Sequence, residues 1–173
     1  MLSAGLIEEG SELQCGPLDD GSLIDVVVTS LQRFKVNRRH VRPGESSTLA
    51  IACQDSDKSA YLEKSIRKGM VLLSKSENNL SSICTFFKAS IFLMPNSKEV
   101  SIGFQGMLFT NVRQSVTVVA IHKKKSISPN ESATVMLHSN KHPEYIHPGY
   151  RLLIQQGVTK AVGRVMAVYP QMS

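Results

Sequence analysis

Two glycines near the amino terminus, Gly5 and Gly10, have the spacing found in loops that bind nucleotide phosphates. Such a loop wraps the phosphates with backbone N–H groups and needs a lysine and a hydroxyl residue directly after the second glycine. Here Ser11 and Glu12 follow, so the lysine is missing and one of the two positions holds an acid. The guanine-reading motif Asn-Lys-x-Asp is also missing from the sequence. We therefore predict no nucleotide-hydrolysing site and no catalytic residue in this sequence.

The segment His142-Pro143-Glu144 matches one half of the zinc deaminase signature, in which the histidine binds the metal and the glutamate moves a proton. The other half, Pro-Cys-x-x-Cys, is absent. The three cysteines, Cys15, Cys53 and Cys84, are too far apart in sequence to supply the closely spaced ligands of a structural zinc site. We assign no metal, expect reduced and buried thiols, and interpret His142, Glu144 and His147 as loop residues.

Two basic runs remain as candidates for binding. The first crowds six side chains into ten residues and comprises Arg33, Lys35, Arg38, Arg39, His40 and Arg42. The second, Lys123–Lys125, follows a segment expected to be a strand. Each run is typical either of an RNA contact or of a solvated hairpin tip, and the sequence leaves these two interpretations open.

The excess of basic charge lies in the second half of the chain. The net charge is +6; residues 1–76 carry ten basic and ten acidic side chains, whereas residues 77–173 carry ten basic and four acidic ones. A basic surface favours polyanions such as RNA, because phosphate contacts release counterions. The alternative is a solvated basic face that binds nothing.

Apolar residues alternate with a period close to two in most segments, which is the signal of a β-strand. The alternation is clearest in residues 26–28, 49–53, 116–122 and 134–138. Turn residues recur between these segments at spacings suited to a meander or a Greek key. The pattern predicts an all-β fold built from two consecutive small β-barrels.

One segment, residues 58–68, favours a short helix, and Gly69 follows as its C-terminal stop. Its expected inner side comprises Tyr61, Leu62, Ser65 and Ile66. A polar joint at about residues 74–82 separates the two expected barrels.

The sequence favours a cytoplasmic protein. No run approaches the roughly 18 consecutive apolar residues of a membrane span. Glu8 and Glu9 stand where a signal peptide would need a basic and then an apolar stretch.

Six short sequence segments, taken in order, resemble those of a known family. They are Gly21-Ser22-Leu23 through Ser30-Leu31-Gln32, Val41-Arg42-Pro43-Gly44-Glu45-Ser46, Ser65-Ile66-Arg67-Lys68-Gly69-Met70, Asn111-Val112-Arg113-Gln114, His142-Pro143-Glu144-Tyr145 and Gly157-Val158-Thr159-Lys160-Ala161-Val162-Gly163. Together the blocks resemble the GTP-binding protein 1 and 2 subfamily of elongation factor Tu-like translational GTPases. The resemblance covers nearly the whole chain.

The resemblance implies that residues 1–76 are the second domain of such a GTPase, lacking its first strand, and that residues 80–173 are the third domain. Both would be β-barrels of the elongation factor Tu type. It also implies a GTPase domain before this chain, which would bind GTP and Mg²⁺ and pack against the barrels. The chain itself would hold no cofactor and would not be an enzyme.

The resemblance further implies two sets of site residues. In the third domain, Arg113, Thr159 and Lys160 fall at positions that face the backbone of tRNA. In the second domain, the positions around the aminoacyl end of tRNA hold Gln32, Phe34, Lys35 and Ser46. All four differ from elongation factor Tu, which has glutamate, histidine and arginine at the first three positions and an asparagine at the fourth. Phe34 can stack on a base, but it lacks the hydrogen-bonding groups of a histidine.

Two functions follow as hypotheses. The first is an RNA-binding and interdomain module that engages tRNA or ribosome-associated RNA. The alternative is a protein-interaction scaffold that clamps the GTPase domain and recruits RNA-decay or ribosome-rescue proteins without contacting tRNA. A phosphate site near Arg113 and Lys160 would favour the first, whereas an exposed apolar groove there would favour the second.

Overall fold

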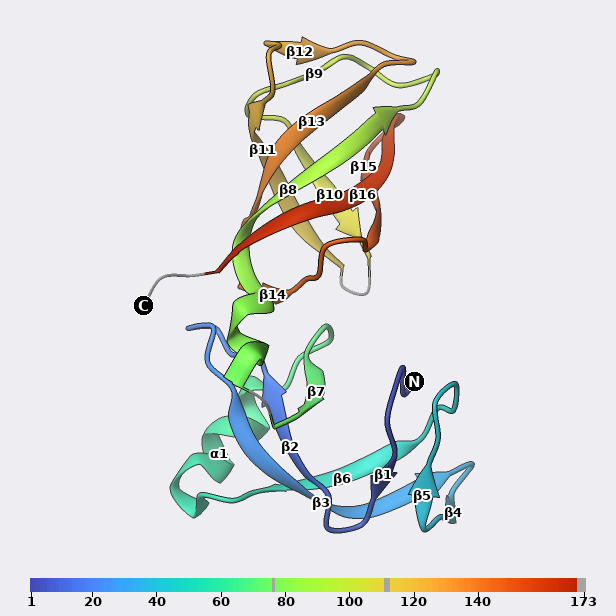
Figure 1. Cartoon of the computed structure of the whole chain (residues 1–173), viewed down its shortest axis with the longest axis vertical. Helices are drawn as coiled ribbons and strands as arrows, with labels where there is room; N and C mark the ends of the chain where they lie inside the picture. The colour runs from blue at the N-terminus through green and yellow to red at the C-terminus, as the bar shows by residue number, and fades with distance from the viewer. Residues whose placement is uncertain (76, 111–112, 171–173) are drawn as a thin grey trace. The chain divides into compact units, whose positions relative to one another are not determined.

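A computed structural model describes residues 1–75, 77–110 and 113–170 of the chain. The chain forms two compact units (Figure 1). The first comprises Met1–Gly16, Leu23–Ile66 and Val71–Glu77, and the second comprises Pro17–Ser22, Arg67–Met70 and Asn78–Ser173. Two short segments from the first half of the sequence thus belong to the second unit. The domain limits expected from the sequence, 1–76 and 80–173, stay a prediction.

The first unit is built on β2 (Glu12–Gly16), β3 (Ile24–Arg33), β4 (Val36–Asn37), β6 (Thr48–Cys53) and β7 (Val71–Ser74). The sheet order is β4-β3-β2-β7, with β6 also paired to β3. A separate ladder joins β1 (Ile7–Glu8) to β5 (His40–Val41). Alternate residues of β3, namely Ile24, Val26 and Val28, are buried. This is the period-two burial that the sequence predicted.

The helix of the first unit, α1 (Ser56–Ser65), begins and ends earlier than the expected 58–68. It begins early because the Asp55 carboxylate accepts a hydrogen bond from the N–H of Asp57, which caps the first turn. It ends at Ser65 because Ile66 has an extended ψ of 121°. Of the expected inner side, Leu62 is buried, whereas Tyr61 and Ile66 are about half exposed.

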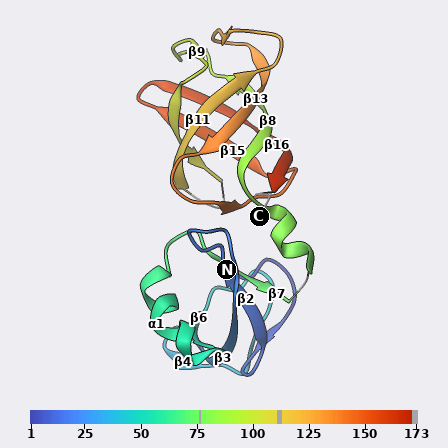
Figure 2. The same cartoon turned by 90° about the vertical axis from the view of Figure 1, so that its left-hand side faces the viewer.

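The second unit is a closed barrel of six described strands. They are β8 (Ile83–Leu93), β10 (Gln105–Phe109), β11 (Arg113–Ile121), β13 (Ser132–Ser139), β15 (Arg151–Gln156) and β16 (Thr159–Pro170). The order is β13-β11-β10-β15-β16-β8, and pairing of β13 with β8 closes the ring. Figure 2 shows β11, β13, β8 and β16 side by side on one wall. The all-β fold class is confirmed.

Short elements complete the second unit. The strands β9 (Val100–Ser101) and β12 (Ser126–Ile127) pair with each other, and β14 (Glu144–Tyr145) pairs with β8. The 3-10 helix η1 (Glu77–Ser82) occupies most of the joint expected at residues 74–82. Residue 76 of that joint lies outside the described residues, as do Asn111 and Val112 of the block that precedes Arg113.

The barrel interior is filled by alternate side chains of every strand. Its largest fully buried members include Phe87, Leu93, Leu108, Leu137 and Ile154. All three cysteines are free; Cys15 and Cys84 are buried and Cys53 is half-buried. Burial raises the pKa of the Cys84 thiol to about 12, so this thiol stays protonated at neutral pH. Over the described ranges, no helix has the length and apolar character needed to cross a membrane.

Candidate nucleic-acid interface

Lys160 is the second residue of β16, a strand that begins directly after a two-residue turn. Gln156 and Thr159 pair across β15 and β16, and Gly157 and Val158 connect them. Gly157 has a φ of +56°, which a glycine adopts without steric cost. Lys160 is exposed, and its cross-strand partner on β15 is Gln155. The turn therefore places an ammonium and an amide side by side on the outer wall of the barrel.

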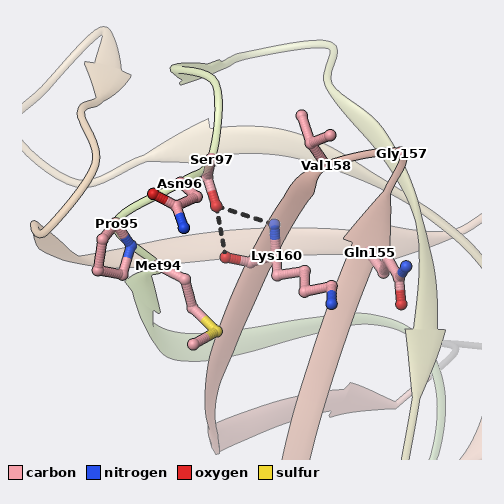
Figure 3. Close-up of a pocket in the computed structure, with 8 residues that line it drawn as sticks. All are labelled: Met94, Pro95, Asn96, Ser97, Gln155, Gly157, Val158 and Lys160. Carbon is pink, nitrogen blue, oxygen red and sulfur yellow. Dashed lines mark hydrogen bonds between the residues drawn. The ribbon is translucent and has the colours of Figure 1, made fainter.

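A hollow of about 470 Å³ opens beside Lys160, shown in Figure 3. The Lys160 N–H donates to Ser97 Oγ (2.9 Å), and Ser97 Oγ donates to the Lys160 carbonyl (3.0 Å). The Met94 N–H donates to the same carbonyl (2.9 Å). These bonds fix the backbone of Lys160 but leave its ammonium free to meet a ligand. The hollow is lined by Met94, Pro95, Asn96, Ser97, Gln155, Gly157, Val158 and Lys160.

Thr159, which was also predicted to contact the RNA backbone, is buried, unlike Lys160. Its side chain is only 4% exposed, and its hydroxyl accepts a hydrogen bond from the N–H of Lys98 (3.2 Å). Thr159 therefore holds the turn of residues 94–98 against β16. A phosphate in the hollow would meet the side chain of Lys160, which is exposed.

Arg113 lies on the same outer wall at the start of β11. Its guanidinium carbon lies 5.3 Å from the centre of the Phe109 ring, and the two residues are cross-strand partners. Phe109 pairs in turn with Leu153 on β15. Leu153 pairs with Val162, two residues from Lys160, so Arg113 and Lys160 are separated by three strand spacings and two residues, roughly 16 Å along the wall. The ring orients the guanidinium without neutralising it.

Two arginines that the sequence reasoning missed lie on the same wall, on the other side of the Leu153–Val162 pair from Lys160. Arg151 on β15 and Arg164 on β16 are direct cross-strand partners, and both are exposed. Like charges that face each other across a ladder destabilise a sheet. The sequence offered a signal for Arg164, because alternation along a strand puts residues 162 and 164 on the same face as Lys160. The pairing with Arg151 needed the strand register, which the sequence alone does not supply.

The described outer wall carries no acid that balances these cations. Within the described residues, Arg113, Arg151, Lys160 and Arg164 take part in no ion pair. The carboxylates of the barrel lie elsewhere: Glu131 pairs with Lys124 (3.2 Å), Glu144 is buried, and Glu99 accepts from the Ser126 hydroxyl. The wall is therefore a basic surface with exposed, unneutralised charge.

The segment that contains the half deaminase signature, residues 142–147, was interpreted from the sequence as a loop, and the structure differs at Glu144. Glu144 lies in β14, is only 2% exposed, and its Oε1 lies 3.4 Å from Nη1 of Arg67. His142 Nδ1 lies 2.8 Å from Oδ1 of Asp19. His147 Nδ1 lies 3.1 Å from the Ser82 hydroxyl. The prediction of a loop was wrong for Glu144, because pairing of β14 with β8 carries its side chain inward.

The first basic run surrounds the hairpin of β3 and β4. Gln32 pairs with Asn37 and Arg33 with Val36, which leaves Phe34 and Lys35 as a two-residue turn. Both have positive φ, 52° and 64°. This geometry matches the type I′ turn, which favours Asn-Gly and is strained for other side chains. The Phe34 side chain is 87% exposed at the tip.

A second hollow, of about 430 Å³, lies beside this hairpin. It is lined by Arg33, Asn37, Arg38, Arg39, His40, Val41, Arg42 and Glu45. The Arg42 N–H and the Arg33 guanidinium lower the pKa of Glu45, which bonds to both. The side chains of Arg38, Arg39 and Arg42 form no ion pair within the described residues. The hollow therefore presents three guanidinium groups to solvent.

The four residues expected around an aminoacyl end do not line this hollow. The Gln32 amide donates to Asn37 Oδ1 (3.0 Å), Phe34 and Lys35 form the turn, and Ser46 is exposed. Their role in recognising an aminoacyl end stays a prediction.

Replacing Phe34 by asparagine and Lys35 by glycine should stabilise the first unit by about 1–2 kcal/mol. The reason is that both new residues adopt the left-handed region with less strain. Urea unfolding of the single and double variants measures the gain. The substitution Lys35→Ala is the matched control and should give no such gain, since alanine is strained at the same φ. A double variant no more stable than the original chain would contradict the assignment of the turn.

The second basic run, Lys123–Lys125, follows β11. Lys123 has a φ of 57°, and Lys124 pairs with Glu131. Lys124 lowers the pKa of Glu131 after the stronger effect of the Ser128 N–H. One of the three charges is thus neutralised within the barrel, so this run is a weaker candidate for RNA than the wall.

No family model matches the chain. GTP-binding protein 2 of Mus musculus and GTP-binding protein 2 of Homo sapiens are each 39% identical to it over 168 residues, which cover 96% of this chain and 26% of each relative. GTP-binding protein 1 of Xenopus laevis is 29% identical over 162 residues, which cover 93% of this chain and 23% of that protein. The chain spans about a quarter of the length of the curated relatives it matches. The resemblance to the GTP-binding protein 1 and 2 subfamily is thereby confirmed along nearly the whole chain.

Proposed function

We propose that this chain is a non-catalytic RNA-binding and interdomain module of a GTP-binding, elongation factor-like protein of the cytoplasm. GTP and Mg²⁺ would bind in another part of the parent protein, and the barrels would pack against that part. The RNA would be tRNA or ribosome-associated RNA, bound through the phosphate backbone. Arg113 and Lys160 would contact phosphates, and Thr159 would hold the turn beside Lys160.

The observation that carries this proposal is the basic outer wall of the barrel. Four cations on β11, β15 and β16 lie within about 16 Å of one another along the wall and have no acidic partner among the described residues. Arg151 and Arg164 oppose each other directly, so an approaching phosphate relieves their repulsion. Cations held on a rigid sheet bind phosphate oxygens without selecting a base sequence.

Fluorescence titration of a labelled tRNA at several salt concentrations tests the proposal. For about two or three neutralised phosphates, log K should fall with log salt at a slope of roughly −2 to −3. Arg113→Ala and Lys160→Ala should each flatten that slope by about one and weaken binding of all RNAs similarly. Gln32→Ala should leave the slope unchanged, because an amide releases no counterion.

The matched control is Lys64→Ala, which removes one exposed charge from α1 in the first unit. It should leave both affinity and slope close to those of the unchanged chain. Unchanged tRNA affinity in the Arg113→Ala/Lys160→Ala double variant would contradict RNA binding by the wall and favour the protein-scaffold hypothesis.

A further inference from the structure

Exposed apolar side chains gather on β8, directly after it, and on β16, beside the basic wall. We call them the β8–β16 face: Phe86, Phe92, Met94, Val162, Met166 and Tyr169, each 38–52% exposed. Phe86 pairs with Tyr169 across the two strands, and Phe92 pairs with Val162. The face thus has an apolar patch towards each end of the strand pair.

A β-bulge adds Met166 to this face. Val165 pairs with Ala89 and Ala167 with Lys88, which leaves Met166 as the extra residue of β16. Such a bulge re-aims a side chain, and here the side chain is 52% exposed. An unbranched thioether adapts to irregular partner surfaces, which suits a docking site.

Between the two patches the face carries cations and no described acid. Lys88 lies on β8 between Phe86 and Phe92, and Arg164 is the cross-strand partner of Ser90. Neither Lys88 nor Arg164 forms an ion pair within the described residues. The complementary partner therefore needs acidic side chains between two apolar anchors.

The backbone of the face excludes a peptide that binds as an added β-strand. β8 pairs with both β13 and β16, and β16 pairs with both β15 and β8. No free strand edge is therefore available here for an added strand. A partner must satisfy its own backbone hydrogen bonds, as an α-helix does.

We propose that the β8–β16 face docks an acidic amphipathic helix from a protein partner. Phe86 and Phe92 are six residues apart, or roughly 20 Å at the usual rise of a strand. A helix covers that length in about 14 residues, so apolar anchors about 14 positions apart reach both patches. Acidic residues midway between the anchors then lie opposite Lys88 and Arg164.

A helix fits this face better than single-stranded RNA does. Bases stack on aromatic rings, but Met94, Val162 and Met166 offer no ring. The Phe86 ring already lies against the His138 imidazole, with ring centres 4.5 Å apart. The proposal goes beyond RNA binding, because it concerns a protein partner. Of the side chains that it uses, Arg164 also belongs to the basic wall.

The test uses the 173-residue chain and a dye-labelled helical peptide of 18 residues. The peptide carries leucine at positions one, four, fifteen and eighteen and glutamate at positions eight and eleven, all on one side of a helix, with alanine and glutamine elsewhere. Phe86→Ser and Met166→Ser should each weaken binding about tenfold, as expected for an anchor residue of an interface. Val119→Ser, which changes a similarly exposed valine on β11, is the matched control and should have no effect.

Exchanging the charges of Lys88 and of the peptide distinguishes a loss of recognition from a loss of folding. Lys88→Glu should weaken binding of the glutamate peptide about tenfold, and a peptide with lysine at positions eight and eleven should bind that variant better than it binds the unchanged chain. The proposal is overturned if the glutamate peptide shows no saturable binding, or if Phe86→Ser and Lys88→Glu leave binding unchanged. It is also overturned if Phe86→Ser abolishes binding of oligouridylate, since the face is then an RNA platform.

Discussion

Replacing Gly163 by alanine should destabilise the barrel of the second unit by about 3 kcal/mol or more, at the upper end of the cost of overpacking. A Cβ atom at this position would lie 2.1 Å from the carbonyl oxygen of Ser90 and 2.9 Å from the Cα of Ile91. Both are backbone atoms of β8, which pairs with β16 at this point. The clash can be relieved only by separating the two strands, because no rotamer change moves a backbone carbonyl.

The matched comparison is Gly106→Ala on β10. A Cβ atom there would lie 2.6 Å from Cγ2 of Ile154 and 3.1 Å from Cε1 of Phe104. These are side-chain atoms that can shift, so the loss should be smaller than for Gly163→Ala. Urea unfolding monitored by circular dichroism measures both. Equal stability of Gly163→Ala and the unchanged chain would show that β8 and β16 are not as close as described.

The example of Gly163 shows what sequence patterns can and cannot predict about this fold. Alternating apolar residues predicted the strands, because one face of each strand must enter the core whatever its partners are. Gly163, in contrast, is consistent from sequence alone with a simple turn. Its role in close approach to β8 depends on a strand about seventy residues earlier in the chain, and local propensity contains no information on that pairing.

In the candidate interface, too, some residues could be predicted from the sequence and others could not. The family resemblance selected Arg113 and Lys160, which both lie exposed on the wall. It also selected Thr159, whose hydroxyl is used within the barrel. Arg151 and Arg164 were missed because only the register of β15 and β16 makes them neighbours. Residue type thus suggested the chemistry, while pairing decided which side chains can act together.

A buried ion pair in the second unit makes its stability depend on pH. The Glu144 Oε1 lies 3.4 Å from Nη1 of Arg67, and Nη2 of Arg67 donates to the carbonyls of Pro17 (3.3 Å) and Pro143 (3.4 Å). Within the described residues, Oε2 of Glu144 and Nε of Arg67 are buried without a hydrogen-bond partner. The pair is therefore incompletely satisfied, and the charge on Glu144 is costly to keep.

Burial raises the pKa of Glu144 from its ordinary 4.5 to about 7, against a smaller opposing effect of Arg67. The folded chain therefore holds this proton up to about pH 7, whereas the unfolded chain releases it near pH 4.5. Between these values the folded state binds more protons, so the free energy of unfolding falls as pH rises. The contribution is fully present below pH 4.5 and is lost through pH 7, by about 3 kcal/mol in total.

Glu144→Gln should remove this dependence, because glutamine keeps the shape and has no proton to lose. We expect the free energy of unfolding of the unchanged chain to fall by about 2–3 kcal/mol between pH 5 and pH 8, and that of the variant to change much less. Arg67→Met should cost about 3–5 kcal/mol at pH 8, where it leaves a buried carboxylate unpaired, and less at pH 5, where Glu144 is neutral. The double variant should recover part of that loss at pH 8 only.

Urea titrations at a series of pH values measure these differences. Glu131→Gln is the control, because Glu131 is a partly exposed carboxylate of the same barrel with a lowered pKa. The free energy of unfolding of Glu131→Gln should fall between pH 5 and pH 8 by as much as that of the unchanged chain, since Glu131 is ionised throughout that range. A loss of equal size in Glu144→Gln and in the unchanged chain would show that another group titrates. Arg67→Met with the same cost at pH 5 and pH 8 would show that the arginine acts through packing, its carbonyl contacts and its ion pair with Asp19 (3.8 Å), not through the charge of Glu144.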